Sequence, residues 1–136
     1  MAGETFLDLA RRAVDTGLDY ARANDLRMTI VVMDATGTVC AAARMDGSRP
    51  ITYAIAVAKA NAARMFGEST GSLATRVKPE NKIAIGQLGQ NVAFLGGGVP
   101  IVRDSVTIGS IGASGGAEAQ DVECADGALA ALGLSG

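Results

Sequence analysis

The sequence predicts an α+β domain in which antiparallel hairpins form one sheet and helices cover it. Short β-branched segments occur in pairs separated by turn residues, which is typical of β-hairpins. Longer segments near both ends and in the middle repeat apolar residues at helical spacing. Hairpins and helices in this order favour layers of each kind over alternating βαβ units. The 136 residues suffice for one domain, and we assign 1–136 to it.

The first half is expected to contain a helix, a hairpin and a second helix. Residues 5–24 repeat apolar side chains every three or four positions, which predicts a helix. The β-branched run at 28–33 predicts a buried strand, and 38–45 predicts its antiparallel partner across the turn at 34–37. Residues 51–66 are apolar or alanine on almost every side, so this helix should be buried on more than one face.

The middle of the chain gives weaker signals. Residues 69–77 predict a short capped helix. Residues 78–91 mix polar and small side chains without a period, so we assign them no helix or strand, and whether they form a mobile flap over a pocket is left open. Residues 92–95 are a candidate strand, which would bring the sheet to about five strands.

The stretch 96–115 is rich in glycine and lies beside strand-forming residues. Segments 100–102 and 106–112 predict a second hairpin, and 118–132 predicts a closing helix. Glycine allows close approach to the main chain, so either a ligand or a second backbone should lie against this stretch. The alternative is a hairpin with tight turns and no ligand.

Composition excludes several classes of function. Histidine is absent, which removes Ser-His-Asp and Cys-His nucleophiles, most zinc sites and a histidine ligand to haem. The net charge is −2 without a basic patch, which argues against nucleic acid as a partner. No apolar run reaches the ~20 residues that span a bilayer, and the N-terminus lacks a signal-peptide pattern, so we expect no membrane partner and a cytoplasmic protein. Cys40 and Cys124 are expected to be buried thiols.

The core must be built from small side chains, because 49% of residues are hydrophobic but only 4% are aromatic. Such cores bring elements close together and often gain further burial between subunits. We therefore expect a homo-oligomer, a dimer or larger.

Arg44 and Asp46 are the first candidate ligand-binding residues. They flank Met45 at the end of a predicted strand, where alternate side chains face one side. An arginine there could hold a carboxylate with two hydrogen bonds. The alternative is a structural ion pair that shapes the turn at Asp46 and Gly47.

Lys59 is a second candidate, since it lies in an otherwise apolar helix. A desolvated lysine can act as a base or nucleophile. The alternatives are a lysine that reaches solvent or an ion pair with a carboxylate. The glycines at 96–98 and 112–115 could offer backbone N–H groups to an anion, with Ser114 as a further donor or a helix cap. Asp121 is expected in the first turn of the last helix, where it complements the dipole.

The order and spacing of these motifs resemble the GlcG/HbpS family, whose domain also forms the C-terminal part of PduO-type proteins. The resemblance covers roughly residues 6–133 and rests on five segments: VVMDATG at 31–37, RMDG at 44–47, Lys59-Ala60, GGVPI at 97–101 and IGSIGASG at 108–115. It implies a profilin-like α-β-α sandwich with a central sheet of about five antiparallel strands, and dimers or larger assemblies. Some relatives bind haem or are linked to corrinoid metabolism. Without histidine, haem would need a ligand such as Tyr20, Tyr53, a methionine or a threonine.

Three hypotheses for function follow. The first is a small-molecule-binding protein whose ligand is an anionic, partly apolar metabolite or a tetrapyrrole. The second is a metal-independent isomerase, hydratase or lyase acting on a small carboxylate, with Asp46 or Lys59 as base. The third is an assembly module without a ligand. The candidate ligand-binding residues are Arg44, Asp46, Lys59, Gly97, Gly98, Pro100 and Ser114, and the cofactor is left open.

Overall fold

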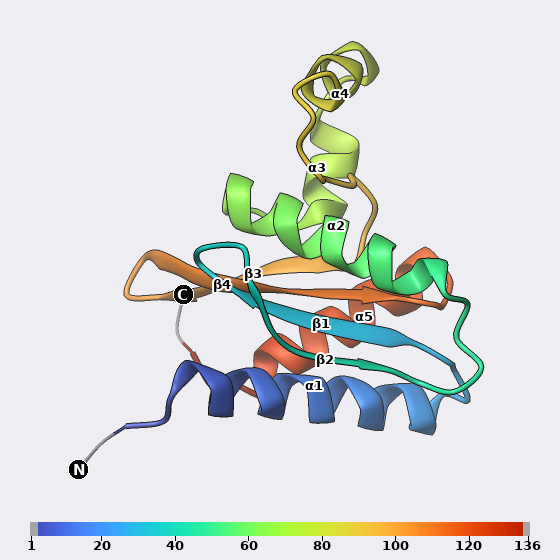
Figure 1. The fold of residues 1–136 in the computed structure, drawn as a ribbon, viewed down its shortest axis with the longest axis vertical. Helices are drawn as coiled ribbons and strands as arrows, with labels where there is room; N and C mark the ends of the chain where they lie inside the picture. The colour runs from blue at the N-terminus through green and yellow to red at the C-terminus, as the bar shows by residue number, and fades with distance from the viewer. Residues whose placement is uncertain (1–2, 135–136) are drawn as a thin grey trace.

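The computed structural model describes residues 3–134 and shows three layers of α, β and α structure (Figure 1). Helices α1 (Phe6–Ala23) and α5 (Glu118–Ala130) cover one face of the sheet, and α2 (Ile51–Phe66) covers the other. The predicted α+β class and the antiparallel sheet between helices are confirmed. The main core lies between the sheet and the pair α1 and α5.

The sheet has four strands in the order β2-β1-β4-β3, and every pair is antiparallel. The strands are β1 (Thr29–Asp34), β2 (Val39–Arg44), β3 (Gly98–Arg103) and β4 (Val106–Ser114). The first five residues of β1 are buried, because this strand lies inside the sheet with helices on both faces. Both predicted hairpins are therefore present, and β4 pairs with β1 to join them.

The expectation of about five strands is wrong, because residues 92–95 form no strand. The Ala93 amide donates to the carbonyl of Ala58 in α2, at 3.2 Å, rather than to the sheet. The Phe94 ring packs edge-on against Phe66, with ring centroids 5.6 Å apart. The apolar character of this segment thus serves packing against α2.

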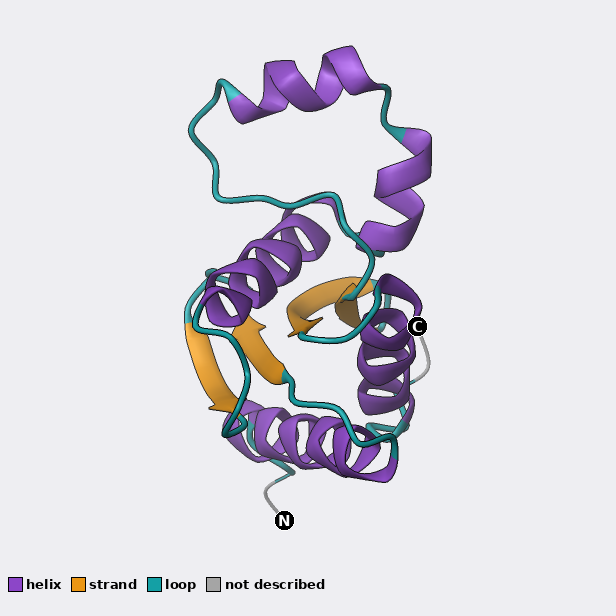
Figure 2. Ribbon diagram, turned by 90° about the vertical axis from the view of Figure 1, so that its right-hand side faces the viewer, coloured by secondary structure: helices purple, strands orange, loops and turns teal. Residues whose placement is uncertain are grey.

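Two short helices follow α2 and extend away from the body of the molecule (Figure 2). The first, α3 (Thr70–Arg76), begins at Ser69, whose hydroxyl accepts the Ser72 amide as predicted for a capped helix. The second, α4 (Pro79–Gly86), lies in the segment that the sequence left without an assignment. Its exposed Ile83 explains why no buried stripe marked the helix. Within residues 3–134, no helix combines the length and apolar character needed to cross a bilayer.

The glycine-rich stretch meets a second backbone, as one of the two interpretations expected. A Cβ on Gly98 would collide with the carbonyl oxygen of Lys59, and a Cβ on Gly112 with that of Ala56. Both carbonyls belong to α2. The glycines of β3 and β4 therefore let α2 lie directly on the sheet.

Candidate functional site

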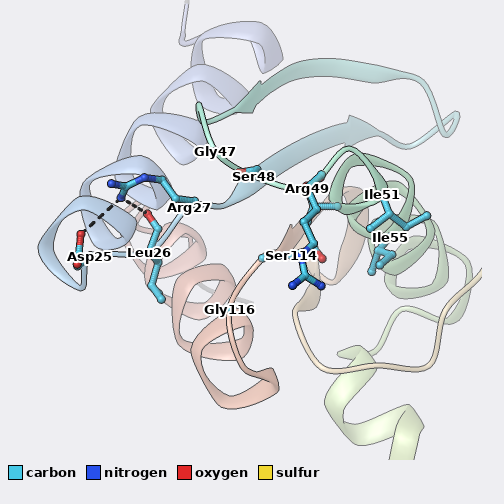
Figure 3. Close-up of a pocket in the computed structure, with 12 residues that line it drawn as sticks. Asp25, Leu26, Arg27, Gly47, Ser48, Arg49, Ile51, Ile55, Ser114 and Gly116 are labelled. Carbon is cyan, nitrogen blue, oxygen red and sulfur yellow. Dashed lines mark hydrogen bonds and ion pairs between the residues drawn. The ribbon is translucent and has the colours of Figure 1, made fainter.

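One end of the sheet carries two neighbouring hollows, at the point where β1 begins and β2 and β4 end. The larger, which we call the serine-lined hollow, encloses about 580 Å³ (Figure 3). The loop before β1, the turn before α2, the first turns of α2 and the end of β4 surround it. Its lining residues are Asp25, Leu26, Arg27, Gly47, Ser48, Arg49, Ile51, Thr52, Ile55, Ser114, Gly115 and Gly116.

Two arginines are among the residues that line the serine-lined hollow. Arg27 lies with Asp25 on one rim, and the Arg49 side chain extends from the turn before α2 (Figure 3). Arg27 approaches Asp25 at 3.5 Å, but that carboxylate is exposed, so the pair is weak. Arg49 forms no ion pair with any of residues 3–134. The hollow therefore presents positive charge.

The N-terminus of α2 adds to this positive character. The helix begins after Pro50 without a side-chain cap, and its first turn contains no acidic residue. By contrast, the amides before α5 are satisfied within the protein: Gly116 donates to Asp121 Oδ1 and Ala117 donates to Gln120 Oε1, both at 2.9 Å. The α2 terminus has no side chain that compensates its partial positive charge, although its Thr52 amide already donates to the Arg49 carbonyl at 3.0 Å.

Ser48 is the unusual residue of the serine-lined hollow. Its side chain is buried, with 5% exposure, and its Oγ has no hydrogen-bond partner among the described residues. Its carbonyl oxygen accepts a hydrogen bond from Arg44 Nη1 at 2.7 Å, which holds the turn in place. A buried hydroxyl without a partner is rare in native proteins and calls for an explanation.

The smaller hollow, which we call the arginine-lined hollow, encloses about 480 Å³ between the end of α1 and the end of β2. Its lining residues are Leu18, Arg22, Arg27, Ala43, Arg44, Met45 and Asp46. Arg44 and Asp46 thus face one hollow together, and they form no ion pair with each other. Arg27 lines both hollows.

Lys59 lies away from both hollows, in the interior. Its Nζ is 2.8 Å from Asp121 Oδ2 and donates to the Ala113 carbonyl at 2.9 Å, and the residue is only 2% exposed. The structure therefore realises the ion-pair alternative for Lys59. Burial raises the pKa of Asp121, against the opposing effects of the Lys59 ammonium and the Gly116 amide. This pair ties α2 to the start of α5, across the end of β4.

The other predicted site residues lie in separate places. Ser114 lines the serine-lined hollow. Gly97 and Gly98 border a cavity of about 60 Å³ beside Lys59. Pro100 lines a more apolar hollow of about 340 Å³ between β3 and α5. The seven candidates therefore do not form one cluster, and Arg44, Asp46 and Ser114 share one end of the molecule.

Sequence reasoning missed Arg27, Ser48 and Arg49 as site residues. A signal for two of them was present, since Ser48 and Arg49 directly precede Pro50 and a helix without an acidic first turn. Such a start leaves the positive end of the helix dipole without an acidic side chain, which favours an anion there. Arg27 carried no comparable signal, because only the folded loop brings it between the two hollows.

Comparison with known proteins assigns the family. Residues 6–130 match the family model described as "Haem degrading protein HbpS-like". The chain belongs to the HbpS-like family. The resemblance stated from the sequence is therefore confirmed, and relatives in solved structures share the fold.

Among HbpS-like relatives, the chain is 32% identical over 130 residues to the corrinoid adenosyltransferase PduO of Salmonella typhimurium. The match covers 93% of this chain but 37% of PduO, so the chain spans little more than a third of that relative. The solved PduOC:haem complex is 27% identical, with a TM-score of 0.88 and 98% coverage of both chains. Klebsiella pneumoniae ORFY is 26% identical, with a TM-score of 0.86, covering 96% of this chain and 91% of its own.

Proposed function

We propose that this HbpS-like chain binds a small, anionic and partly apolar ligand, with a tetrapyrrole such as haem as the first candidate. The observation that carries the proposal is the concentration of arginines around the two hollows. The lining of the two hollows contains more arginines than carboxylates. The arginines are Arg22, Arg27, Arg44 and Arg49, and the carboxylates are Asp25 and Asp46. Arginine holds carboxylates with paired hydrogen bonds, so this end suits the propionates of a tetrapyrrole. The solved haem complex of PduOC supports haem as the first ligand to test.

The residues fit the charged part of haem better than its iron. Met45 is the one lining residue of the two hollows with a side chain of a usual haem-ligand type, and its sulfur already accepts the Met28 amide at 3.4 Å. The Tyr20 hydroxyl donates to Glu123 at 2.6 Å, and this bond raises the pKa of Tyr20 to about 12. A phenolate ligand from Tyr20 is therefore disfavoured. We propose that binding rests on the propionates and on apolar contact.

A haemin titration followed by Soret absorbance tests this proposal. We expect saturable binding by the wild-type chain. Arg44→Gln should weaken it about tenfold, the loss typical of one charge-assisted contact. Arg103→Gln is the matched control, because this exposed arginine at the end of β3 lies outside both hollows. Absence of saturable binding, or equal effects of the two substitutions, would overturn the proposal.

The enzyme hypothesis is tested separately, by replacing its candidate general base, Asp46. Asp46 lines the arginine-lined hollow beside Arg44, an arrangement that would suit a base next to a bound carboxylate. A screen of small unsaturated carboxylates should show no turnover if the chain only binds its ligand. Turnover that disappears in a folded Asp46→Asn variant would instead establish an enzyme.

We also propose that the chain forms a homo-oligomer. Large apolar side chains are exposed on α2 and on the α3–α4 extension: Ile51, Tyr53, Met65, Phe66 and Ile83, with Leu88 just after α4. Contact between copies of the chain would remove these side chains from water. Sedimentation equilibrium should give a dimer or larger species, and a monomer at all concentrations would refute this part of the proposal.

A further inference from the structure

We propose that the serine-lined hollow is a seat for the phosphoryl group of an organic phosphate. This inference goes beyond the proposed function, which requires carboxylates held at the arginines and does not require a phosphoryl ligand. It rests on four observations at this hollow: an unpartnered buried hydroxyl, an uncapped helix N-terminus, free positive charge and an apolar wall.

The first observation is the hydroxyl of Ser48. Ser48 is one of the lining residues, and its Oγ is buried and has no partner in the described part of the chain. A buried polar group without a hydrogen bond destabilises the folded state, so such groups are found where a ligand or an ion completes them. Because the Oγ atom itself is covered, the Ser48 side chain must rotate about its Cα–Cβ bond before an anionic oxygen in the hollow can accept the hydrogen bond that this hydroxyl lacks.

The second observation is the N-terminus of α2 at the edge of the same hollow. Ile51 and Thr52 line it, and neither a side-chain cap nor an acidic residue competes for the positive end of this 16-residue helix. Helix N-termini bind phosphate through free amides and the helix dipole. At α2 the Thr52 amide already donates to the Arg49 carbonyl at 3.0 Å, so the attraction would come from the helix dipole and the Ile51 amide. At α5 the amides of Gly116 and Ala117 are already bonded to side chains, so that helix does not offer the same site.

The third observation is the distribution of donors. Arg49 forms no ion pair with residues 3–134, and Arg27 has only the exposed Asp25 as partner. Arg49 and Ser114, at the end of β4, line the hollow, whereas the Arg27 guanidinium extends toward Asp25 (Figure 3). A planar carboxylate offers two oxygens in one plane, whereas a phosphoryl group offers three in different directions. The arrangement from several sides favours the tetrahedral anion.

The fourth observation is the apolar wall. Leu26, Ile51 and Ile55 line the hollow beside the donors, and Ile51 is exposed by 58%. The volume of about 580 Å³ exceeds the space that a single inorganic anion occupies and falls in the range of small-molecule sites. The ligand class is therefore a phosphate ester with a compact apolar body.

Isothermal titration calorimetry with phenyl phosphate, inorganic phosphate and benzoate tests the inference. We expect phenyl phosphate to bind the wild-type chain most tightly, inorganic phosphate more weakly and benzoate most weakly. Ser48→Ala and Arg49→Gln should each weaken phenyl phosphate about tenfold, the effect of losing a hydrogen bond to a charged group. Arg103→Gln should leave the affinity unchanged, because this side chain lies outside the hollow.

Several outcomes would overturn the inference. These are absence of saturable phenyl phosphate binding, benzoate binding as tight as phenyl phosphate, or equal affinities of the wild type and Arg49→Gln. Arg49 is exposed and forms no ion pair within residues 3–134, so this variant keeps the test valid even if Ser48→Ala folds poorly. Haemin binding without phenyl phosphate binding would refute this seat alone, and the converse would refute the proposed function alone.

Discussion

The ion pair between Lys59 and Asp121 gives the sharpest prediction for stability. The Lys59→Met change removes the ammonium but keeps a side chain of similar length. It leaves the Asp121 carboxylate buried at 5% exposure, with the Gly116 amide as its remaining donor. It also removes the hydrogen bond to the Ala113 carbonyl. The Asp121 carboxylate and the Ala113 carbonyl thus both lose the hydrogen bond that the Lys59 ammonium donates in the wild type.

The expected cost of Lys59→Met is about 3–5 kcal/mol, the usual effect of removing one partner of a buried pair. Domains of this kind unfold with roughly 5–15 kcal/mol, so the variant should lose a large part of its stability. A loss of this size corresponds to a fall in Tm of roughly 10–20 °C for a domain of this length. Urea denaturation followed by circular dichroism measures it directly.

The matched control is Lys78→Met, at an exposed lysine just before α4. It should change stability by less than about 0.5 kcal/mol. The double variant Lys59→Met/Asp121→Leu should recover part of the loss, because an apolar pair leaves no buried charge without a partner. A Lys59→Met protein within about 1 kcal/mol of the wild type would refute the reasoning.

Two further predictions follow from packing and from proton binding. Gly112→Val should destabilise the fold by more than about 2 kcal/mol, because its Cβ would collide with the Ala56 carbonyl in α2; an unchanged unfolding midpoint in urea would contradict the close contact. Since the bond to Glu123 raises the pKa of Tyr20 from 10.0 to about 12, the contribution of this bond to stability should be complete below pH 10 and lost as the pH rises to about 12. Tyr20→Phe should abolish that part of the alkaline fall in stability, measured by urea denaturation across the same pH range, and an equal fall in both proteins would contradict the assignment.

Helices and strands were predictable from the sequence where a buried face requires apolar residues at regular spacing. The helix at 51–66 was predicted with the bounds that the structure shows, because a long run of alanine and apolar residues without a turn signal is typical of a helix. Its expected burial on more than one face was wrong, since α2 covers one face of the sheet and exposes large side chains such as Tyr53 and Met65. Helix α4 escaped prediction because its apolar residues, such as Ile83, face solvent and follow no stripe. The apolar run at 92–95 resembled a strand because short apolar segments have no distinct period, and its contacts are with α2.

The candidate site was only partly predictable. Arg44 and Asp46 both line one hollow, although Asp46 lies in the turn after β2 and not on the strand that the spacing argument assumed. The partner of Lys59 could not be assigned from sequence, since Asp121 is 62 positions away and meets it only through the packing of α2 against β4 and α5. The burial of Ser48 likewise arises from the folded turn and the residues packed around it, and the neighbouring sequence does not predict it.

The contact of α2 with Gly98 and Gly112 has a consequence for the serine-lined hollow, because the Ala56 carbonyl that meets Gly112 directly follows Ile55, a residue that lines the hollow. Because the main chain of α2 rests on the main chain of β3 and β4 at Gly98 and Gly112, hardly any deformable side chain lies between them. These two backbone contacts therefore fix the distance between α2 and the sheet. A substitution at Gly112 that moves α2 away from the sheet would also displace the first turn of α2. The geometry of the serine-lined hollow therefore depends on a glycine that would not itself contact a ligand there.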